Sequence, residues 1–158
     1  MRSHRWKPYA AFIALSEAVG AVSALFTREG TEVFQSSVAK SDLTPPPVVF
    51  PVVWPFLYAL MGVSAARVWQ APPSAERRKG LRLFAVQLAV NFAWSFLFFN
   101  GQLYALSFLW LLLLWVLVLC MIRSFGRVDR LAARLQIPYL LWLSFAAYLN
   151  AVTWYLNR

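Results

Sequence analysis

The sequence predicts an all-α integral membrane protein, in which one bundle of five transmembrane helices fills residues 1–158. Five apolar stretches of 18 to 22 residues match the roughly 20 residues that a helix needs to cross the hydrocarbon core of a bilayer. Hydrophobic residues make up 61% of the chain and charged residues 13%, whereas water-soluble domains average roughly 45–50% and about 25%. The stretches do not alternate polar with apolar residues as the strands of a membrane barrel do, so helices are favoured.

The apolar stretches place the five helices at residues 9–26, 48–69, 81–99, 103–122 and 135–156. The first stretch follows a basic segment, as the apolar core of a signal peptide does, but no small-x-small cleavage site follows it. We therefore interpret it as a helix of the bundle. Pro51, Pro55 and Pro138 each remove a backbone hydrogen bond inside a helix, and the resulting kinks open space for a pocket.

The connections between the helices are very unequal in length. The segment 27–47 is the longest, and loops of this length are often functional lids or disordered. We expect a lid, with apolar residues such as Phe34 on the membrane surface. The run Pro45–Pro47 at its end predicts a stiff polyproline II segment. The short segment 100–102 predicts a tight antiparallel hairpin between the third and fourth helices.

The basic residues are distributed asymmetrically between the two sides of the predicted bundle. Cytoplasmic loops are enriched in Lys and Arg, and 12 of the 15 basic residues fall on one side. With five crossings, the N-terminus lies on this cytoplasm-equivalent side of a bacterial or an organelle membrane. Because this topology explains the net charge of +9, we expect no nucleic-acid partner. The 12 residues are Arg2, Arg5, Lys7, Arg67, Arg77, Arg78, Lys79, Arg82, Arg123, Arg127, Arg130 and Arg134.

Histidine and cysteine are too scarce to support several kinds of site. The chain has one cysteine, Cys120, and one histidine, His4, which precedes the first helix. A structural metal site needs about four ligands, and a histidine-ligated haem or a Ser–His–Asp triad needs a histidine among the helices. We therefore expect no metal ligand, no catalytic residue and no intrachain disulfide.

Polar residues inside the helices are the strongest functional pattern. Gln87, Asn91 and Ser95 recur every fourth residue on one face of the third helix, and such costly groups usually face the bundle interior. They either link helices structurally or line a ligand site, and the two roles are compatible. Glu17 is the only acid well inside a helix. It is a candidate proton carrier, ligand partner or buried neutral group.

The opposite face of the third helix carries only small residues at the same spacing. Ala85, Ala89 and Ala93 allow a close approach of a second helix. This face suits a contact with another helix or with a second copy of the chain, and we expect it to be the contact surface of a homodimer.

Three tryptophans lie deeper in the helices than tryptophans at a membrane interface usually do. Trp54, Trp94 and Trp142 offer flat rings for stacking and indole N–H groups that anchor an acceptor. This combination suits a flat, mostly apolar ligand.

Three segments together resemble the TspO/MBR family, whose members are the translocator protein, or peripheral-type benzodiazepine receptor, and the bacterial tryptophan-rich sensory proteins. The segments are PPPVVFPVVWPFLYALMG in the second helix, QLAVNFAWSFLFF in the third and AARLQIPYLLWLSFAAYLNAVTWYLN in the fifth. The resemblance covers almost the whole chain, with the helices in the same order.

The resemblance implies a homodimeric five-helix bundle with a sensory, regulatory or transport role. It implies binding of porphyrins such as protoporphyrin IX and haem, of sterols and of benzodiazepine-type ligands, with no obligatory cofactor. The matching pocket positions are Ala24, Trp54, Asn91, Trp94, Trp142, Ala146 and Leu149, with Tyr104 and Ser107 matched less directly, and Glu17, Gln87 and Ser95 as further polar candidates. Val152, Tyr155 and Arg158 fit a sterol-recognition pattern.

The lid departs from the family pattern at one residue. Relatives commonly carry a tryptophan before the prolines that correspond to Pro45 and Pro46, and this chain has Leu43. In the family that tryptophan is tied to porphyrin photochemistry, so we expect ligand binding with little light-dependent degradation. A porphyrin-degrading enzyme and a transporter of porphyrin or another apolar solute are the alternatives. The missing internal repeat argues against the inverted-repeat plan of many transporters. Glu17 also stands where relatives usually have a small residue.

Overall fold

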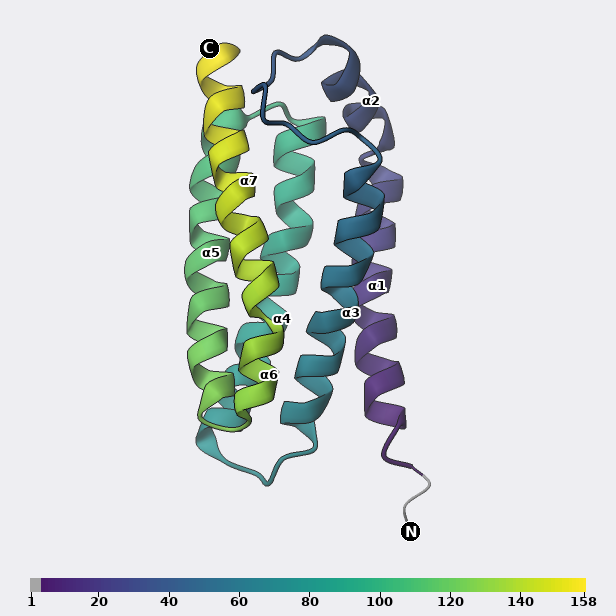
Figure 1. Ribbon diagram of the computed structural model, residues 1–158, viewed down its shortest axis with the longest axis vertical. Coiled ribbons are helices and arrows are strands. Elements are labelled where there is room, and N and C mark those ends of the chain that lie inside the picture. Colours follow the sequence, from purple (N-terminus) through teal and green to yellow (C-terminus); the bar gives the residue numbers. More distant parts are fainter. Residues whose placement is uncertain (1–3) are drawn as a thin grey trace.

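The computed structural model describes residues 4–158, and its regular structure is entirely helical (Figure 1). Five helical stretches among these residues are long and apolar enough to cross a membrane, which confirms the predicted class. The segments are α1 (Lys7–Phe26), α2 (Arg28–Ser37), α3 (Val49–Trp69), α4 (Ala75–Ser95), the π-helix η1 (Phe96–Asn100), α5 (Tyr104–Gly126), α6 (Arg130–Leu135) and α7 (Ile137–Leu156).

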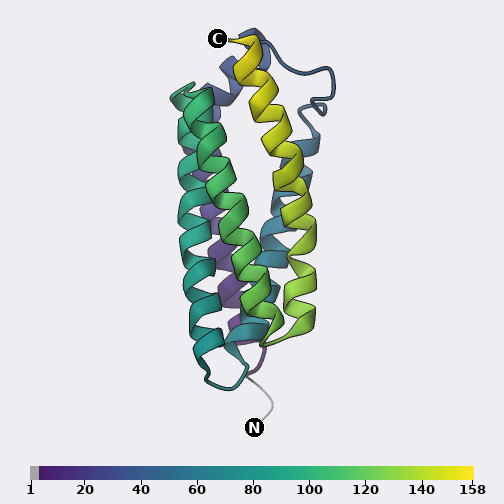
Figure 2. The same cartoon turned by 90° about the vertical axis from the view of Figure 1, so that its left-hand side faces the viewer.

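The long helices run side by side along one axis in alternating directions, as Figures 1 and 2 show. Helix α1 packs on α3, α4 on α5, and α5 on α7, while α6 contacts both α3 and α5. The described N-terminal end lies at the lower end in Figure 1, and the C-terminus and α2 lie at the upper end. The short hairpin predicted between the third and fourth helices is the turn that joins η1 to α5.

The predicted lid contains a helix that the hydropathy pattern did not indicate. Helix α2 occupies half of the segment 27–47, and the ring of Phe34 packs 5.2 Å from Phe98 and 5.6 Å from Phe99. The Lys40 ammonium donates to the carbonyl oxygens of Phe34, Gln35 and Val38. These bonds satisfy carbonyls that a helix end leaves without partners. Phe34 therefore faces protein where we expected it on the membrane surface.

Several helices extend beyond their apolar stretches. Helix α4 begins at Ala75, six residues before the predicted start at 81, because the Ser74 hydroxyl caps it by accepting from the Arg77 backbone N–H. Helix α6 begins after Asp129, whose carboxylate accepts from the Ala132 N–H. Apolarity marks the membrane-embedded part of a helix, whereas capping decides where the helix starts.

Helices α1 and α3 approach closely because both carry glycines at the contact. A Cβ on Gly62 would lie 2.5 Å from the Cα of Ile13, and a Cβ on Gly20 would overlap the Tyr58 ring. The face of α1 that is buried consists of small polar residues, and such residues let membrane helices pack tightly. Its buried members are Ser16 and Ser23, and Thr27 caps the helix end.

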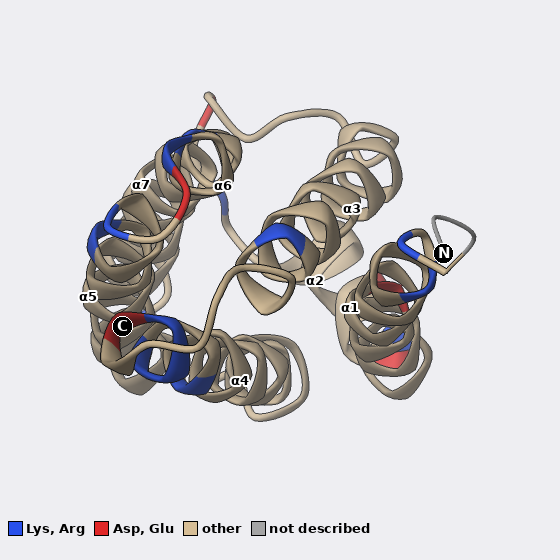
Figure 3. Ribbon diagram, turned by 90° about the horizontal axis from the view of Figure 1, so that it is seen from below, with Lys and Arg blue, Asp and Glu red and all other residues tan. Residues whose placement is uncertain are grey.

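The basic segments gather at one end of the bundle. The start of α1, the α3–α4 turn and the α5–α6 turn all lie at the lower end of Figure 1, which Figure 3 shows from below. Two ion pairs join the α3–α4 region to the α5–α6 turn, Arg67 to Asp129 at 2.8 Å and Arg127 to Glu76 at 2.9 Å. Arg2 lies outside the described residues. The side of the membrane that this end faces stays a prediction.

Candidate functional site

A chain of hydrogen bonds links three helices in the middle of the bundle. The Tyr58 hydroxyl on α3 donates to the Asn91 Oδ1 on α4 at 2.8 Å, and the Asn91 Nδ2 donates to the Tyr139 hydroxyl on α7 at 2.7 Å. Tyr139 in turn donates to the Gln87 Oε1 at 2.9 Å. All four residues are buried. Asn91 and Gln87 therefore link helices, and a direct contact with a ligand stays a prediction for both.

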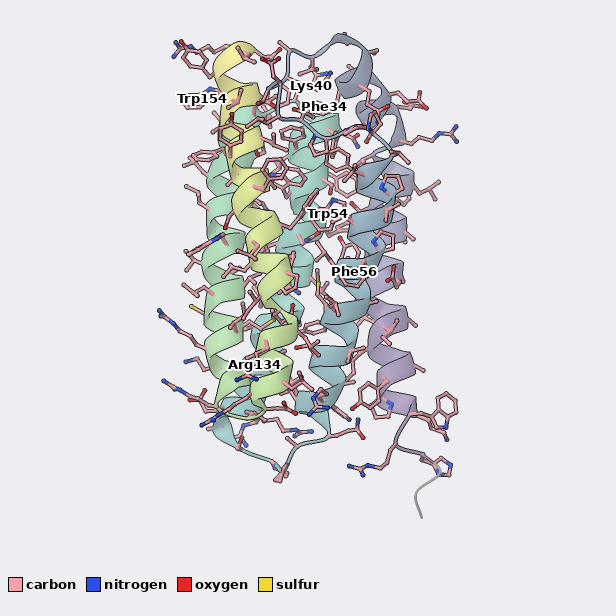
Figure 4. The ribbon with its side chains drawn as sticks, in the orientation of Figure 1. Phe34, Lys40, Trp54, Phe56, Arg134 and Trp154 are labelled. Atoms are coloured by element: carbon pink, nitrogen blue, oxygen red, sulfur yellow. The ribbon has the colours of Figure 1, made fainter. Side chains whose placement is uncertain are left out.

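Aromatic rings from α3 and α7 meet beside this network and form the α3–α7 aromatic cluster. The ring of Trp54, labelled in Figure 4, lies 5.6 Å from Tyr58 and 6.4 Å from both Tyr139 and Trp142. The Phe50 ring lies 5.9 Å from Trp142. The tilted and edge-on angles are those that aromatic pairs prefer. The cluster thus consists of Phe50, Trp54, Tyr58, Tyr139 and Trp142.

The indole N–H groups divide five of the eight tryptophans into two classes. Those of Trp94, Trp110 and Trp115 donate to the Asn150 Oδ1, the Val90 carbonyl and the Ser144 hydroxyl, at 2.8 to 3.1 Å. Among residues 4–158, the N–H groups of Trp54 and Trp142 donate to no acceptor, and neither nitrogen is sealed from its surroundings. The two rings meet edge to face from α3 and α7, and both N–H donors are open to an added acceptor.

A second aromatic group lies beneath α2. Trp94 stacks on Phe98 with ring centroids 4.9 Å apart, and Phe98 also meets Tyr104 at 5.1 Å and Phe34 of α2. The Tyr104 carbonyl accepts from the Asn150 Nδ2 and from the Ser107 hydroxyl. These contacts bring Trp94, Tyr104 and Ser107 together in a group that is separate from the Trp54–Trp142 contact.

The lid is fastened to the end of α7. Asn157 exchanges two hydrogen bonds with the backbone of Ala39, at 3.2 and 2.8 Å, and the hydroxyls of Ser41 and Tyr148 lie 3.3 Å apart. Leu43 is 64% exposed, and of the two lid prolines Pro45 is half-buried and Pro46 exposed. The residue that departs from the family pattern therefore does not contribute to the packing under the lid.

The remaining candidate residues are dispersed. Ala146 packs against the core, while Ala24 is exposed on α1. Ser95, Leu149 and Glu17 are half-buried. In the sterol pattern Val152 is half-buried, Tyr155 is exposed, and the Arg158 guanidinium lies 4.4 Å from the Tyr155 ring.

On the outer face of α4, Ala85 and Ala89 are exposed. Ala93 lines a shallow apolar hollow of about 390 Å³ between α4 and α5. Ala85 and Ala89 make this face available to a second copy, but a dimer stays a prediction.

Sequence reasoning missed the two buried tyrosines of the cluster. Tyr58 follows Trp54 by four residues and Tyr139 precedes Trp142 by three, so each pair lies on one helix face. This spacing could have identified them. Tyrosine in a membrane protein usually marks the interface, so the residue type alone does not indicate a buried position.

Comparison with known proteins identifies relatives along nearly the whole chain. The sequence profile described as the TspO/MBR family matches residues 12–156. The chain is 36% identical over 149 residues to "Tryptophan-rich protein TspO" of Chlorobaculum tepidum, covering 92% of both chains. It is 36% identical over 150 residues to "Protein CrtK" of Rhodobacter capsulatus, covering 94% of this chain and 92% of that one. It is 32% identical over 155 residues to "Translocator protein" of Bos taurus, covering 97% and 92%.

Proposed function

The chain belongs to the TspO/MBR family, a family of integral membrane helix bundles, and from that premise we propose that it binds a porphyrin between α3 and α7. The observation that carries this proposal is the pair of open indole N–H groups on Trp54 and Trp142. A porphyrin such as protoporphyrin IX is a flat apolar ring with carboxylate acceptors at its edge. It matches both the rings and the donors of this pair.

The α3–α7 aromatic cluster supplies the apolar part of the proposed site. Trp54 and Trp142 meet edge to face, with 87° between their ring planes. A flat ligand that inserts between the two rings exchanges their mutual contact for two contacts with the ligand. Insertion requires both rings to turn. The buried tyrosines behind Trp54 are held by Asn91 on both hydroxyls. This arrangement supports a role for Asn91 in holding the two tyrosines in place behind Trp54, on one side of the site.

The proposed recognition acts on the porphyrin ring and not on a bound iron. The membrane-spanning helices contain no histidine, since His4 precedes α1. Free porphyrin and haem are therefore expected to bind with similar affinity. Sterols and benzodiazepine-type ligands are further candidate ligands, and competition with porphyrin tests whether they share the site. Binding at this site is compatible with a sensory, a regulatory or a transport role.

The test is a titration of purified full-length protein with protoporphyrin IX, followed by quenching of tryptophan fluorescence. We expect saturable quenching. Trp54→Phe and Trp142→Phe each keep an aromatic ring but lose one N–H donor. A hydrogen bond to a charged carboxylate contributes about 1.5–3 kcal/mol, so each variant should bind roughly tenfold to 150-fold more weakly.

Trp115→Phe is the matched control, because its indole N–H already donates to Ser144 at 2.9 Å and its ring lies outside the cluster. It should leave the dissociation constant unchanged. If the wild type, Trp54→Phe and Trp142→Phe all bind protoporphyrin IX equally well, the porphyrin does not bind at this tryptophan pair. Absence of saturable quenching in the wild type would refute porphyrin binding altogether.

A further inference from the structure

The upper end of the bundle carries a hollow of about 590 Å³, where the end of α1 and the start of α2 meet the turn after η1. None of its lining residues belongs to the α3–α7 aromatic cluster. Its chemistry is therefore separate from the proposed porphyrin site.

The walls of the hollow are fixed by close contacts. A Cβ on Gly30 would lie 2.6 Å from the Phe99 carbonyl oxygen and 2.6 Å from the Asn100 Oδ1, so α2 lies directly against η1. The Asn100 Nδ2 donates to the Phe26 carbonyl oxygen at 3.0 Å, which joins η1 to the end of α1. Three chain segments thus hold the hollow in place.

The lining changes from apolar to polar where the membrane-spanning stretches end. The first stretch ends at Phe26 and the third at Asn100, so the hollow lies where hydrocarbon gives way to headgroups. On its apolar side, Leu25 is 69% exposed and Phe26 63% exposed. On its polar side lie Arg28, Glu29 and Gln102. This is the polarity profile of a phospholipid at the level of its glycerol backbone.

The polar side presents a cation and an anion next to each other. The Glu29 carboxylate and the Gln102 amide have no hydrogen-bond or ion-pair partner within residues 4–158. The Arg28 Nε lies 3.4 Å from Glu32, which leaves its terminal nitrogens open. Guanidinium groups bind phosphate, and carboxylates accept hydrogen bonds from ammonium groups. The pair is complementary to a zwitterion and not to a net anion.

We propose that this hollow binds a zwitterionic phospholipid with a primary ammonium group. Its phosphate meets Arg28, its ammonium donates to Glu29 and Gln102, and its acyl chains lie along Leu25 and Phe26. A quaternary ammonium has no N–H to donate, so phosphatidylcholine is disfavoured. Anionic lipids are drawn to the opposite, lower end, where the basic segments gather.

The test is native mass spectrometry of the full-length protein in detergent, with phosphatidylethanolamine, phosphatidylcholine and phosphatidylglycerol of identical acyl chains. We expect one phosphatidylethanolamine to bind roughly threefold to tenfold more tightly than phosphatidylcholine, the effect of one charge-assisted hydrogen bond at a partly exposed site. Glu29→Gln should reduce this preference to about one. Glu32→Gln removes a carboxylate of the same helix that does not line the hollow, and it should keep the preference.

Three results would overturn the proposal. One is equal binding of the two zwitterionic lipids to the wild type, and another is a preference that persists in Glu29→Gln. The third is efficient competition by water-soluble glycerophosphoethanolamine, which would mean that the headgroup alone is recognised and that Leu25 and Phe26 contribute nothing. The protoporphyrin titration of Glu29→Gln should match that of the wild type, so failure of this site and of the porphyrin site are distinguishable.

Discussion

At the scale of single residues, the centre of the bundle depends on a few buried hydroxyl and amide groups. Tyr139 is fully buried and both accepts from Asn91 and donates to Gln87. Its hydroxyl therefore connects the two amides of α4. Removing it leaves two buried polar groups with fewer partners in a medium that offers none.

We expect Tyr139→Phe to lower the free energy of unfolding by about 1–2 kcal/mol, because it removes two buried hydrogen bonds that inside a membrane contribute about 0.6 kcal/mol each or somewhat more. Reversible unfolding in mixed micelles measures it. Tyr155→Phe is the control, since Tyr155 is 61% exposed. An identical loss in both variants would show that the buried network contributes no more than an exposed hydroxyl.

Asp129 makes the lower end of the bundle sensitive to acid. Burial acts to raise the pKa of this carboxyl, but the hydrogen bond from the Ala132 N–H and the Arg67 guanidinium outweigh it and hold the pKa below its ordinary value. A carboxyl whose pKa is lowered by folding stabilises the protein above its unfolded pKa, about 4. This contribution is lost as the pH falls through the folded pKa.

The wild type should therefore lose stability below about pH 4 more steeply than Asp129→Asn, which has no carboxyl to titrate at this position. Melting temperatures between pH 6 and pH 3 measure the difference. Parallel curves for the two proteins would mean that the ion pair with Arg67 does not contribute to acid sensitivity.

At the scale of elements, α2 is the least expected part of the fold. Helix α2 is short and amphipathic, and its average hydropathy does not distinguish it from a loop. Its C-terminus is stabilised by Lys40, whose ammonium bonds three carbonyls and lies 5.1 Å from the Phe34 ring centroid. A single side chain from outside the helix thus closes it.

Lys40→Gln should loosen the end of α2, because a neutral amide with two N–H donors cannot satisfy three carbonyls. Amide hydrogen exchange of residues 35–38 should speed up by roughly threefold or more, which corresponds to about 0.7 kcal/mol of local stability. Lys79→Gln, at an exposed position in the first turns of α4, is the control. Unchanged amide exchange in Lys40→Gln would mean that the end of α2 is stabilised by the packing of Phe34 and not by Lys40.

At the scale of the whole molecule, the outer face of α4 is not covered by any of the residues from 4 to 158. Ala85 and Ala89 are exposed there, and in lipid such a small-residue stripe permits close helix contact. We propose that two copies of the chain associate through this face.

Ala89→Phe places a large ring in the proposed contact, so detergent-solubilised protein should shift from dimer to monomer in light scattering coupled to size exclusion. Ala14→Phe adds the same ring to an exposed position on α1 and should leave the dimer intact. A dimer that persists in Ala89→Phe would move the interface to another face.

The sequence alone determined the all-α class, the five membrane-crossing stretches and the gathering of basic residues on one side. These properties follow from hydrophobic length and charge, which each stretch carries by itself. It also selected Trp54, Asn91 and Trp142, because a polar or aromatic group in the middle of a membrane helix is conspicuous without any partner.

Only the tertiary structure decided which of these groups are already satisfied. Asn91 and Trp94 have hydrogen-bond partners on other helices, whereas the indole N–H groups of Trp54 and Trp142 have none within the part of the chain that the structure describes. It also revealed α2, the tyrosines behind Trp54 and the hollow beside Glu29. Each depends on contacts between distant segments, and the hydropathy of one segment carries no information about the partner it will meet.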